Sequence, residues 1–133
     1  MKKSFVSLCL LASFVAFTGC SNAGESTAAG EIVPGIPVKN TVTLVDLGAK
    51  TCIPCKMMAP ILEELKEEYK GRAEVIFIDV WDKANDGKAQ AFKVSSIPTQ
   101  VVYDRQGVEV FRHMGFLEKK ALTEQLDKYL AVK

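Results

Sequence analysis

The chain has 133 residues, of which 48% are hydrophobic, 25% charged and 8% aromatic. This length is sufficient for one globular domain with its own hydrophobic core, and two domains are not expected. Seventeen Lys and Arg against sixteen Asp and Glu give a formal charge of +1. This near-neutral charge gives no reason to expect a nucleic-acid partner. Four cysteines are too few for a disulfide-rich scaffold, and they occur at positions 9, 20, 52 and 55.

The first twenty residues have the pattern of an export signal. Two lysines precede an uncharged apolar run over residues 5–17, which is shorter than the about twenty residues of a membrane-spanning helix. The run leads through small residues to Cys20 and resembles the bacterial lipoprotein signal, in which that cysteine is lipidated. We therefore expect residues 1–19 to be a signal peptide and Cys20 to anchor the protein in the bacterial cell envelope, facing the periplasm or the exterior. The alternative is ordinary secretion with Cys20 left as a free thiol.

Residues 20–38 are small and polar, with two prolines and few large apolar side chains. Such a segment buries too little apolar surface to offset the entropy lost on ordering. We expect it to be a flexible tether that leads to a folded domain over residues 39–133.

Hydrophobic periodicity predicts alternating strands and helices within that domain. Apolar, β-branched runs predict strands over residues 41–47, 74–80, 99–103 and 108–112. Apolar residues at spacings of three and four predict helices over residues 55–70 and 118–130, and weaker signals predict a short helix over 84–92. The first two strands flank a helix and are expected to be parallel, whereas the last two are expected to form an antiparallel hairpin.

Cys52 and Cys55 lie between the first predicted strand and the first long helix. At this place the positive end of the helix stabilises a thiolate on Cys52, while Cys55 lies one turn inside and is shielded. These positions predict that Cys52 attacks disulfides and that Cys55 resolves the mixed disulfide.

The order of elements and three further positions resemble the thioredoxin family over residues 39–133. Asp46 matches the family's buried acid and implies a proton acceptor for Cys55, and Pro60 matches the proline within the active-site helix. The resemblance implies an α/β fold of the thioredoxin type, with a central mixed four-stranded sheet flanked by helices. The family's first strand and helix are expected to be shortened, because only the polar tether precedes the first predicted strand.

The same resemblance implies a substrate-binding edge. Pro98 matches the family's cis-proline, which would place the backbone of Ile97 against Cys52, where an extended substrate chain can pair with it. Ile53 and Pro54, between the two cysteines, are expected to contact substrate as well. The family commonly has tryptophan before the first cysteine, where this chain has Thr51.

The cysteine pair has three other possible roles. A structural disulfide would close a very short ring and constrain the unfolded chain little. Zinc is disfavoured because two thiolates and one distant histidine do not supply four ligands. A copper-handling chaperone is the main rival, since thiolates and thioethers select Cu(I) and the chain also has Met57, Met58 and His113. We expect Met58 to lie in the core, and we expect no metal and no cofactor.

The residues between the cysteines also predict the direction of the reaction. Ile53 and Pro54 have no side-chain donor to stabilise a thiolate, which favours a reductase over a disulfide oxidase or isomerase. The expected substrates are disulfide-containing exported proteins, with apocytochrome c as one candidate. The expected electron donor is a membrane-embedded thiol reductase, and the protein is expected to be a monomer.

Overall fold

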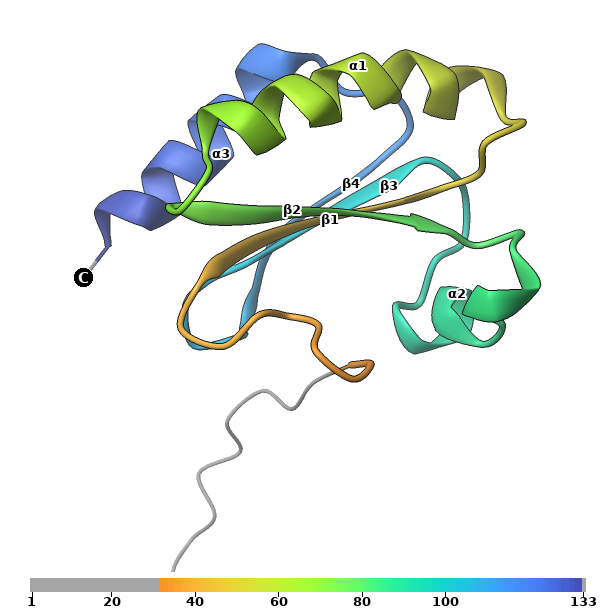
Figure 1. Ribbon diagram of the computed structural model, residues 1–133, viewed down its shortest axis with the longest axis horizontal. Helices are drawn as coiled ribbons and strands as arrows, with labels where there is room; N and C mark the ends of the chain where they lie inside the picture. The colour runs from red at the N-terminus through yellow and green to blue at the C-terminus, as the bar shows by residue number, and fades with distance from the viewer. Residues whose placement is uncertain (1–31, 133) are drawn as a thin grey trace, which may run out of the picture.

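The computed structural model describes residues 32–132 (Figure 1). The expected signal peptide and Cys20 lie outside this range. The strands are β1 (Val42–Gly48), β2 (Ala73–Asp79), β3 (Thr99–Tyr103) and β4 (Glu109–Met114). The helices are α1 (Ile53–Glu68), α2 (Lys88–Ala91) and α3 (Lys119–Ala131), and a 3₁₀ turn covers Lys83–Asn85. Within the described part of the chain, no helix is both long and apolar enough to cross a membrane.

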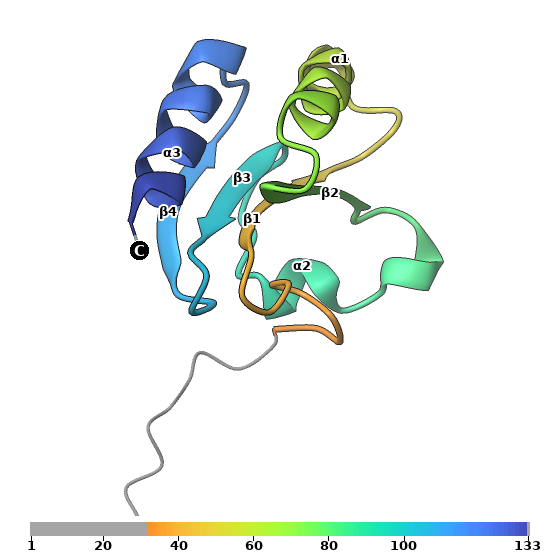
Figure 2. The same ribbon diagram turned by 60° about the vertical axis from the view of Figure 1, so that its left-hand side comes forward.

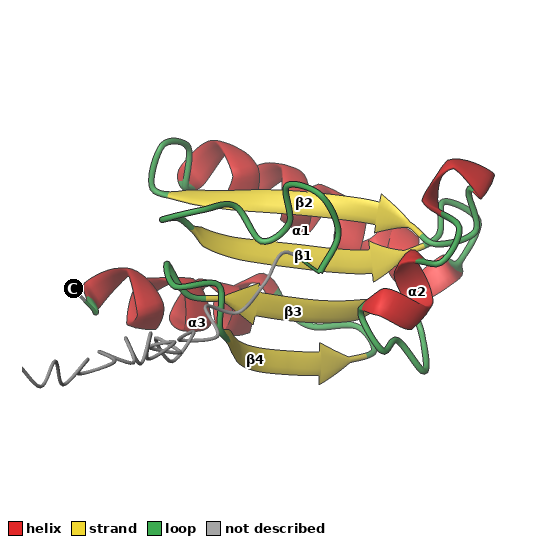
Figure 3. Cartoon of the chain, turned by 90° about the horizontal axis from the view of Figure 1, so that it is seen from below, coloured by secondary structure: helices red, strands yellow, loops and turns green. Residues whose placement is uncertain are grey.

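The strands form one mixed sheet in the order β2-β1-β3-β4 (Figure 3). β1 pairs with β2 in parallel, and β3 is antiparallel to both β1 and β4. All seven residues of β1 are buried, as expected of a central strand that is covered on both faces. The predicted α/β fold with a mixed four-stranded sheet, a parallel pair and a terminal hairpin is confirmed.

Helices α1 and α3 cover one face of the sheet, and α2 lies on the other side (Figure 2). The even-numbered residues of β1 face α1 and α3, because successive side chains of a strand point to opposite faces. This layer packs the buried side chains of Val42, Leu44, Met58, Leu62, Leu65, Leu122 and Leu126 into one cluster. The burial of Met58 in this cluster confirms its predicted place in the core.

The folded part of the chain begins earlier than predicted. Ile32, Val33 and Ile36 pack against the second core cluster, which contains Val45 and Leu47 of β1. The Ile36 amide donates to the Val33 carbonyl at 2.9 Å and closes this segment into a tight loop. The predicted boundary at residue 39 is therefore wrong. The predicted tether contains three large apolar side chains that pack against the sheet, although its other residues are mostly small and polar.

The boundaries of two helices also differ from the prediction. α1 begins at Ile53 rather than at residue 55, since Pro54 in its first turn needs no N–H partner there. The helix expected over residues 84–92 is divided into the 3₁₀ turn and the short α2. Gly87 separates the two, and its φ of 80° cannot continue a right-handed helix.

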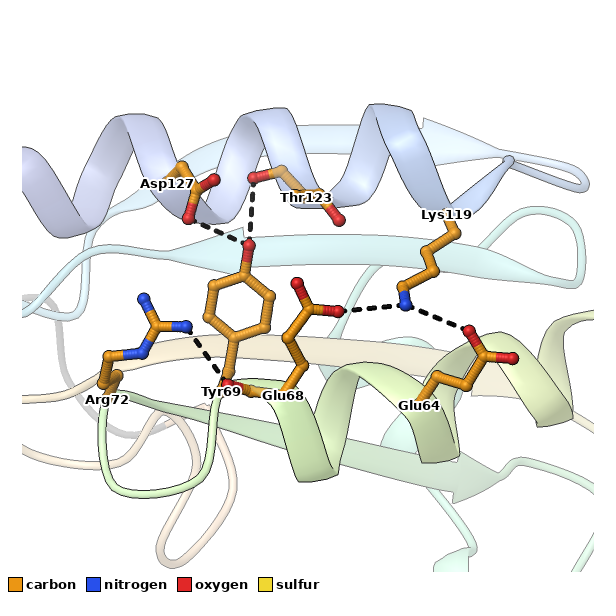
Figure 4. Close-up of polar contacts among 7 residues, drawn as sticks. All are labelled: Glu64, Glu68, Tyr69, Arg72, Lys119, Thr123 and Asp127. Carbon is orange, nitrogen blue, oxygen red and sulfur yellow. Dashed lines mark hydrogen bonds and ion pairs between the residues drawn. The ribbon is translucent and has the colours of Figure 1, made fainter.

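Polar contacts hold α1 against α3 (Figure 4). The buried Tyr69 hydroxyl, just after α1, donates to an Asp127 carboxylate oxygen of α3 at 2.9 Å. Lys119 of α3 reaches back to α1 and forms ion pairs with Glu64 at 3.0 Å and Glu68 at 2.9 Å. These contacts fix the far end of the helix whose first turn carries the two cysteines.

Candidate active site

The first turn of α1 places both cysteines. Cys52 is the N-cap residue of the helix and is partly exposed, whereas Cys55 lies in the first turn and is only 3% exposed. The Lys56 amide donates to the Cys52 carbonyl at 3.0 Å, which is the first hydrogen bond of the helix. Both cysteines are free thiols. Cys52 is therefore partly accessible and Cys55 is shielded, as the sequence predicts.

Burial controls the acidity of the shielded thiol. The pKa of Cys55 is raised to about 11, mainly by desolvation and next by a hydrogen bond with Cys52. A hydrogen bond with the Ala49 backbone acts in the opposite direction, and the negative charge of Asp46 raises the Cys55 pKa again. Cys55 therefore stays protonated at neutral pH and needs a proton acceptor before it can attack a disulfide.

Gly48, at the end of β1, allows the Cys55 sulfur to lie close to the sheet. A Cβ atom at position 48 would lie 3.2 Å from the Cys55 Sγ and 3.1 Å from the Phe77 ring. Both distances are shorter than ordinary van der Waals contact, so a side chain at position 48 would require Cys55 or Phe77 to move by a few tenths of an ångström. Gly48 was not predicted as a site residue, because the only signal for it in the sequence is a glycine at the end of a buried strand.

Asp46 is a fully buried carboxyl group in the middle of the central strand. Burial raises its pKa from 3.8 to about 6, and a hydrogen bond from Gln100 partly opposes this shift. Because its charge also raises the pKa of Cys55, the two groups interact electrostatically. The structure thus places the predicted acid on the α1 face of the sheet, near the shielded thiol.

Sequence reasoning missed Gln100, the direct partner of that acid. Gln100 pairs with Asp46 across β1 and β3, and its side-chain Nε2 donates to Asp46 Oδ1 at 2.8 Å. Its side chain is fully buried, like that of Asp46. A lone side-chain amide in the strand TQVVY, which is buried throughout, was the available signal.

The predicted substrate edge lies at the same end of the sheet as the cysteines. Thr99 pairs with Leu47, so Pro98 lies next to the end of β1. The Ile97–Pro98 bond is cis, as the resemblance implied, and the Gly115 amide donates to the Pro98 carbonyl at 2.8 Å. Pro98 is buried and Ile97 half-buried. The placement of the Ile97 backbone against the Cys52 sulfur stays a prediction.

Between the cysteines, Ile53 is 75% exposed and Pro54 is half-buried. The Ile53 side chain is therefore accessible, and the contact of Ile53 and Pro54 with substrate stays a prediction. On another side of Cys55, a cavity of about 210 Å³ is walled by Phe77, Ala59 and Leu62. The shielded thiol thus lies between the core and a mostly apolar hollow.

The three residues of the copper hypothesis lie in different surroundings. The Met58 sulfur lies in the core and accepts a hydrogen bond from the Leu117 amide at 3.4 Å, while Met57 is 53% exposed. His113 Nε2 lies 3.3 Å from the Phe116 carbonyl oxygen. Over residues 32–132, no group of three or more His, Cys, Asp or Glu side chains is placed to hold a metal ion.

Comparison with known proteins gives one consistent family. The family model described as Thioredoxin matches residues 34–128. The thioredoxin of Staphylococcus aureus strain Mu50 is 44% identical over 93 residues, which cover 70% of this chain and 86% of that protein. The thioredoxins of strains MW2 and USA300 match with the same identity and coverage.

Proposed function

The chain belongs to the thioredoxin family and is a thiol–disulfide oxidoreductase, and from this premise we propose that it reduces disulfides of exported proteins outside the cytoplasm. The Cys52 thiolate attacks a substrate disulfide, forms a mixed disulfide and releases the first substrate thiolate. Cys55 then loses its proton and attacks the Cys52 sulfur. The Cys52–Cys55 disulfide forms, the second substrate thiolate leaves, and two electrons have passed to the substrate.

The observation that carries this proposal is the asymmetry of the cysteine pair. Cys52 is partly exposed at the start of α1, whereas Cys55 is 3% exposed with its pKa raised to about 11 by burial. Only the first sulfur is open to an incoming disulfide. The second becomes a nucleophile after the mixed disulfide has formed beside it, provided that a base accepts its proton.

The reducing direction is supported by the residues between the cysteines. A strong oxidant of this chemistry owes its high potential to a stabilised reduced form. Ile53 and Pro54 offer no side-chain donor that would stabilise the thiolate form. We therefore expect a redox equilibrium near the about −270 mV of thioredoxin and far from the about −120 mV of a strong oxidant. Equilibration with a buffer of known potential measures this value, and a result near the oxidant value refutes the reductase and favours an oxidase or isomerase.

The site of action is supported by the first twenty residues. Their short apolar run ends at Cys20 as in a bacterial lipoprotein signal, and acyl chains on that cysteine would hold the protein at a membrane surface. Mass spectrometry of the mature N-terminus tests this anchor. An unmodified Cys20 refutes lipidation, and activity confined to the cytoplasmic fraction refutes export.

Substrates and electron donor are identified by trapping. Cys55→Ser leaves Cys52 able to attack but removes the resolving thiol, so mixed disulfides with exported proteins accumulate in the native membrane. Cys52→Ser is the matched control and traps nothing. We expect a membrane-embedded thiol reductase and exported proteins, with apocytochrome c as a candidate, among the trapped partners. Normal turnover by Cys55→Ser would refute the resolving role.

Two further measurements separate this proposal from its alternatives. A variant that combines Met57→Leu with His113→Gln should reduce insulin as the unmodified protein does, because neither side chain takes part in dithiol exchange. Loss of insulin reduction in that variant would show that one of these side chains takes part in the exchange and would contradict this expectation. Size-exclusion chromatography with light scattering tests the proposed monomer, which a dimer mass would contradict.

A further inference from the structure

We propose that Gln100 is a positioning residue for the resolving step, whose side-chain amide holds one oxygen of Asp46 and leaves the other oxygen to accept the Cys55 proton. The inference rests on the proposed function, since it concerns the second half of the dithiol exchange. Gln100 itself touches neither substrate nor the reacting sulfurs in this role. It acts through the carboxyl group that it orients.

The contact is built into the rigid centre of the sheet. Asp46 and Gln100 are directly opposite each other in the antiparallel pairing of β1 and β3, so their side chains lie on the same face. The Gln100 Nε2 donates to Asp46 Oδ1 at 2.8 Å, and both side chains have no exposed surface. Because two buried strands fix the pair and Gln100 holds one oxygen, the carboxyl group has little freedom to rotate.

The second oxygen of the carboxyl group is left without a partner. Among residues 32–132, Asp46 Oδ2 and Gln100 Oε1 are buried acceptors with no hydrogen bond. Buried polar atoms normally have a partner, so an orphaned oxygen in a central strand needs an explanation. A role as proton acceptor explains the unpaired oxygen, because Oδ2 binds a hydrogen only when the Cys55 proton is transferred to it. When Asp46 is protonated, the free Gln100 oxygen can serve as an acceptor in turn.

The ionisable surroundings of Asp46 are few in the described part of the chain. Cys55 faces it from α1, and its register neighbour on β2 is the neutral Phe77. His113 of β4 is the register neighbour of Gln100, and Lys119 of α3 is engaged by two glutamates. The charged residues that line the cavity beside Cys55 are Lys50, Lys56 and Glu63. The carboxylate of Asp79, on β2, accepts hydrogen bonds from two backbone amides. Gln100 supplies the side-chain hydrogen bond that lowers the pKa of Asp46.

A neutral partner suits a group that must both take and release a proton. A lysine or arginine in this place would hold Asp46 as a carboxylate, since an adjacent opposite charge lowers an acid's pKa by one to three units. The amide of Gln100 lowers it less and leaves the value at about 6. Asp46 can therefore accept the proton when the Cys55 S–H bond breaks, and can pass it on after the Cys52–Cys55 bond has formed and the substrate sulfur has left.

The two halves of the exchange can be followed separately with a symmetrical aromatic disulfide whose thiolate product is coloured. The reduced full-length protein releases one coloured thiolate when Cys52 attacks and a second when Cys55 resolves. For Gln100→Leu, we expect the rate of the first release to stay within about twofold of the rate of the unmodified protein. The pH midpoint of the second release should rise by about one unit relative to the unmodified protein, because one charge-assisted hydrogen bond to Asp46 is lost. At a pH below the midpoints of both proteins, the second release should then be about tenfold slower in the variant.

Three comparisons make the outcome decisive. Gln100→Leu should have no additional effect in an Asp46→Asn background, and Gln90→Leu, at an exposed position in α2, should change neither release. Gln100→Met serves if the leucine variant does not fold, and carbon-13 NMR titration of the Asp46 carboxyl then measures its pKa directly. The role of Gln100 would be overturned if Gln100→Leu had the same pH midpoint of the second release as the unmodified protein, or if it changed both releases equally. A midpoint shift by Gln100→Leu that persists in the Asp46→Asn background would overturn it as well. Release of a single thiolate by the unmodified protein would instead refute the proposed exchange, and the NMR titration would still test the contact.

Discussion

Gly48 lies so close to Cys55 that a Cβ atom on Gly48 would stand 3.2 Å from the Cys55 sulfur. The end of the central strand is thus shaped around the shielded thiol. Gly48→Ala should lower the free energy of unfolding by about 1–3 kcal/mol, since overpacking forces neighbouring atoms to shift. It should also slow the release of the second coloured thiolate, because Cys55 is displaced. Denaturant unfolding and rapid mixing measure the two effects.

Phe77→Ala provides the control for this variant, because the Phe77 ring is the other atom group within 3.1 Å of that position. If Gly48→Ala still slows the second release in the Phe77→Ala background, the conflict lies with Cys55. Full recovery in that background would show that the ring alone is responsible.

Asp46 should make the protein less stable at neutral pH than in acid. Its pKa is raised from 3.8 to about 6, so the native state binds more protons than the unfolded state between these values. Stability is therefore highest below pH 4 for this group and falls as pH rises through 6. Asp46→Asn should raise the free energy of unfolding by roughly 3 kcal/mol at pH 8, and this gain should vanish near pH 3. Urea titrations across this pH range measure it.

Asp86→Asn is the matched control, since Asp86 is exposed and should give a difference near zero at every pH. A gain for Asp46→Asn that is equal at pH 3 and pH 8 would mean that the buried charge is not its cause.

The Tyr69 hydroxyl joins α1 to α3 at the end of α1 opposite the cysteines. Tyr69→Phe removes its 2.9 Å hydrogen bond to Asp127 and should lower the free energy of unfolding by about 1–2 kcal/mol. Insulin reduction should stay unchanged, because the first turn of α1 is untouched. Lys119→Met, which removes exposed ion pairs, should have a smaller effect that declines with added salt. Equal losses for the two variants would contradict this ranking.

Residues 32–38 should contribute to stability although their composition predicts a tether. A chain that begins at residue 32 should unfold at the same denaturant concentration as one that begins at residue 21. Removal through residue 38 takes away Ile32, Val33 and Ile36 from the second core cluster, and should lower the free energy of unfolding by roughly 2–4 kcal/mol. Equal stability of all three chains would show that these side chains add nothing.

Much of the fold could be predicted from local sequence pattern. The strand over residues 99–103 has the predicted bounds, and the first helix differs by two residues at each end. The apolar stripe of α1 identified Met58 as a core residue, because a helix buries the side chains at spacings of three and four. Residues 32–38 and the divided helix before β3 were missed, since a few apolar groups or one glycine change a segment without altering its overall composition.

For the candidate site, local sequence pattern was enough to predict which residues carry the chemistry. Two cysteines at a helix start and an acid in an apolar strand are local patterns whose physical consequences do not depend on distant neighbours. The side chains that surround them could be identified from the packed fold alone. Gln100 meets Asp46 across 54 positions of sequence because two strands pair in one register, and Gly48 meets Cys55 because α1 packs back on the sheet. Such contacts are set by the packing of distant segments, which no local periodicity records.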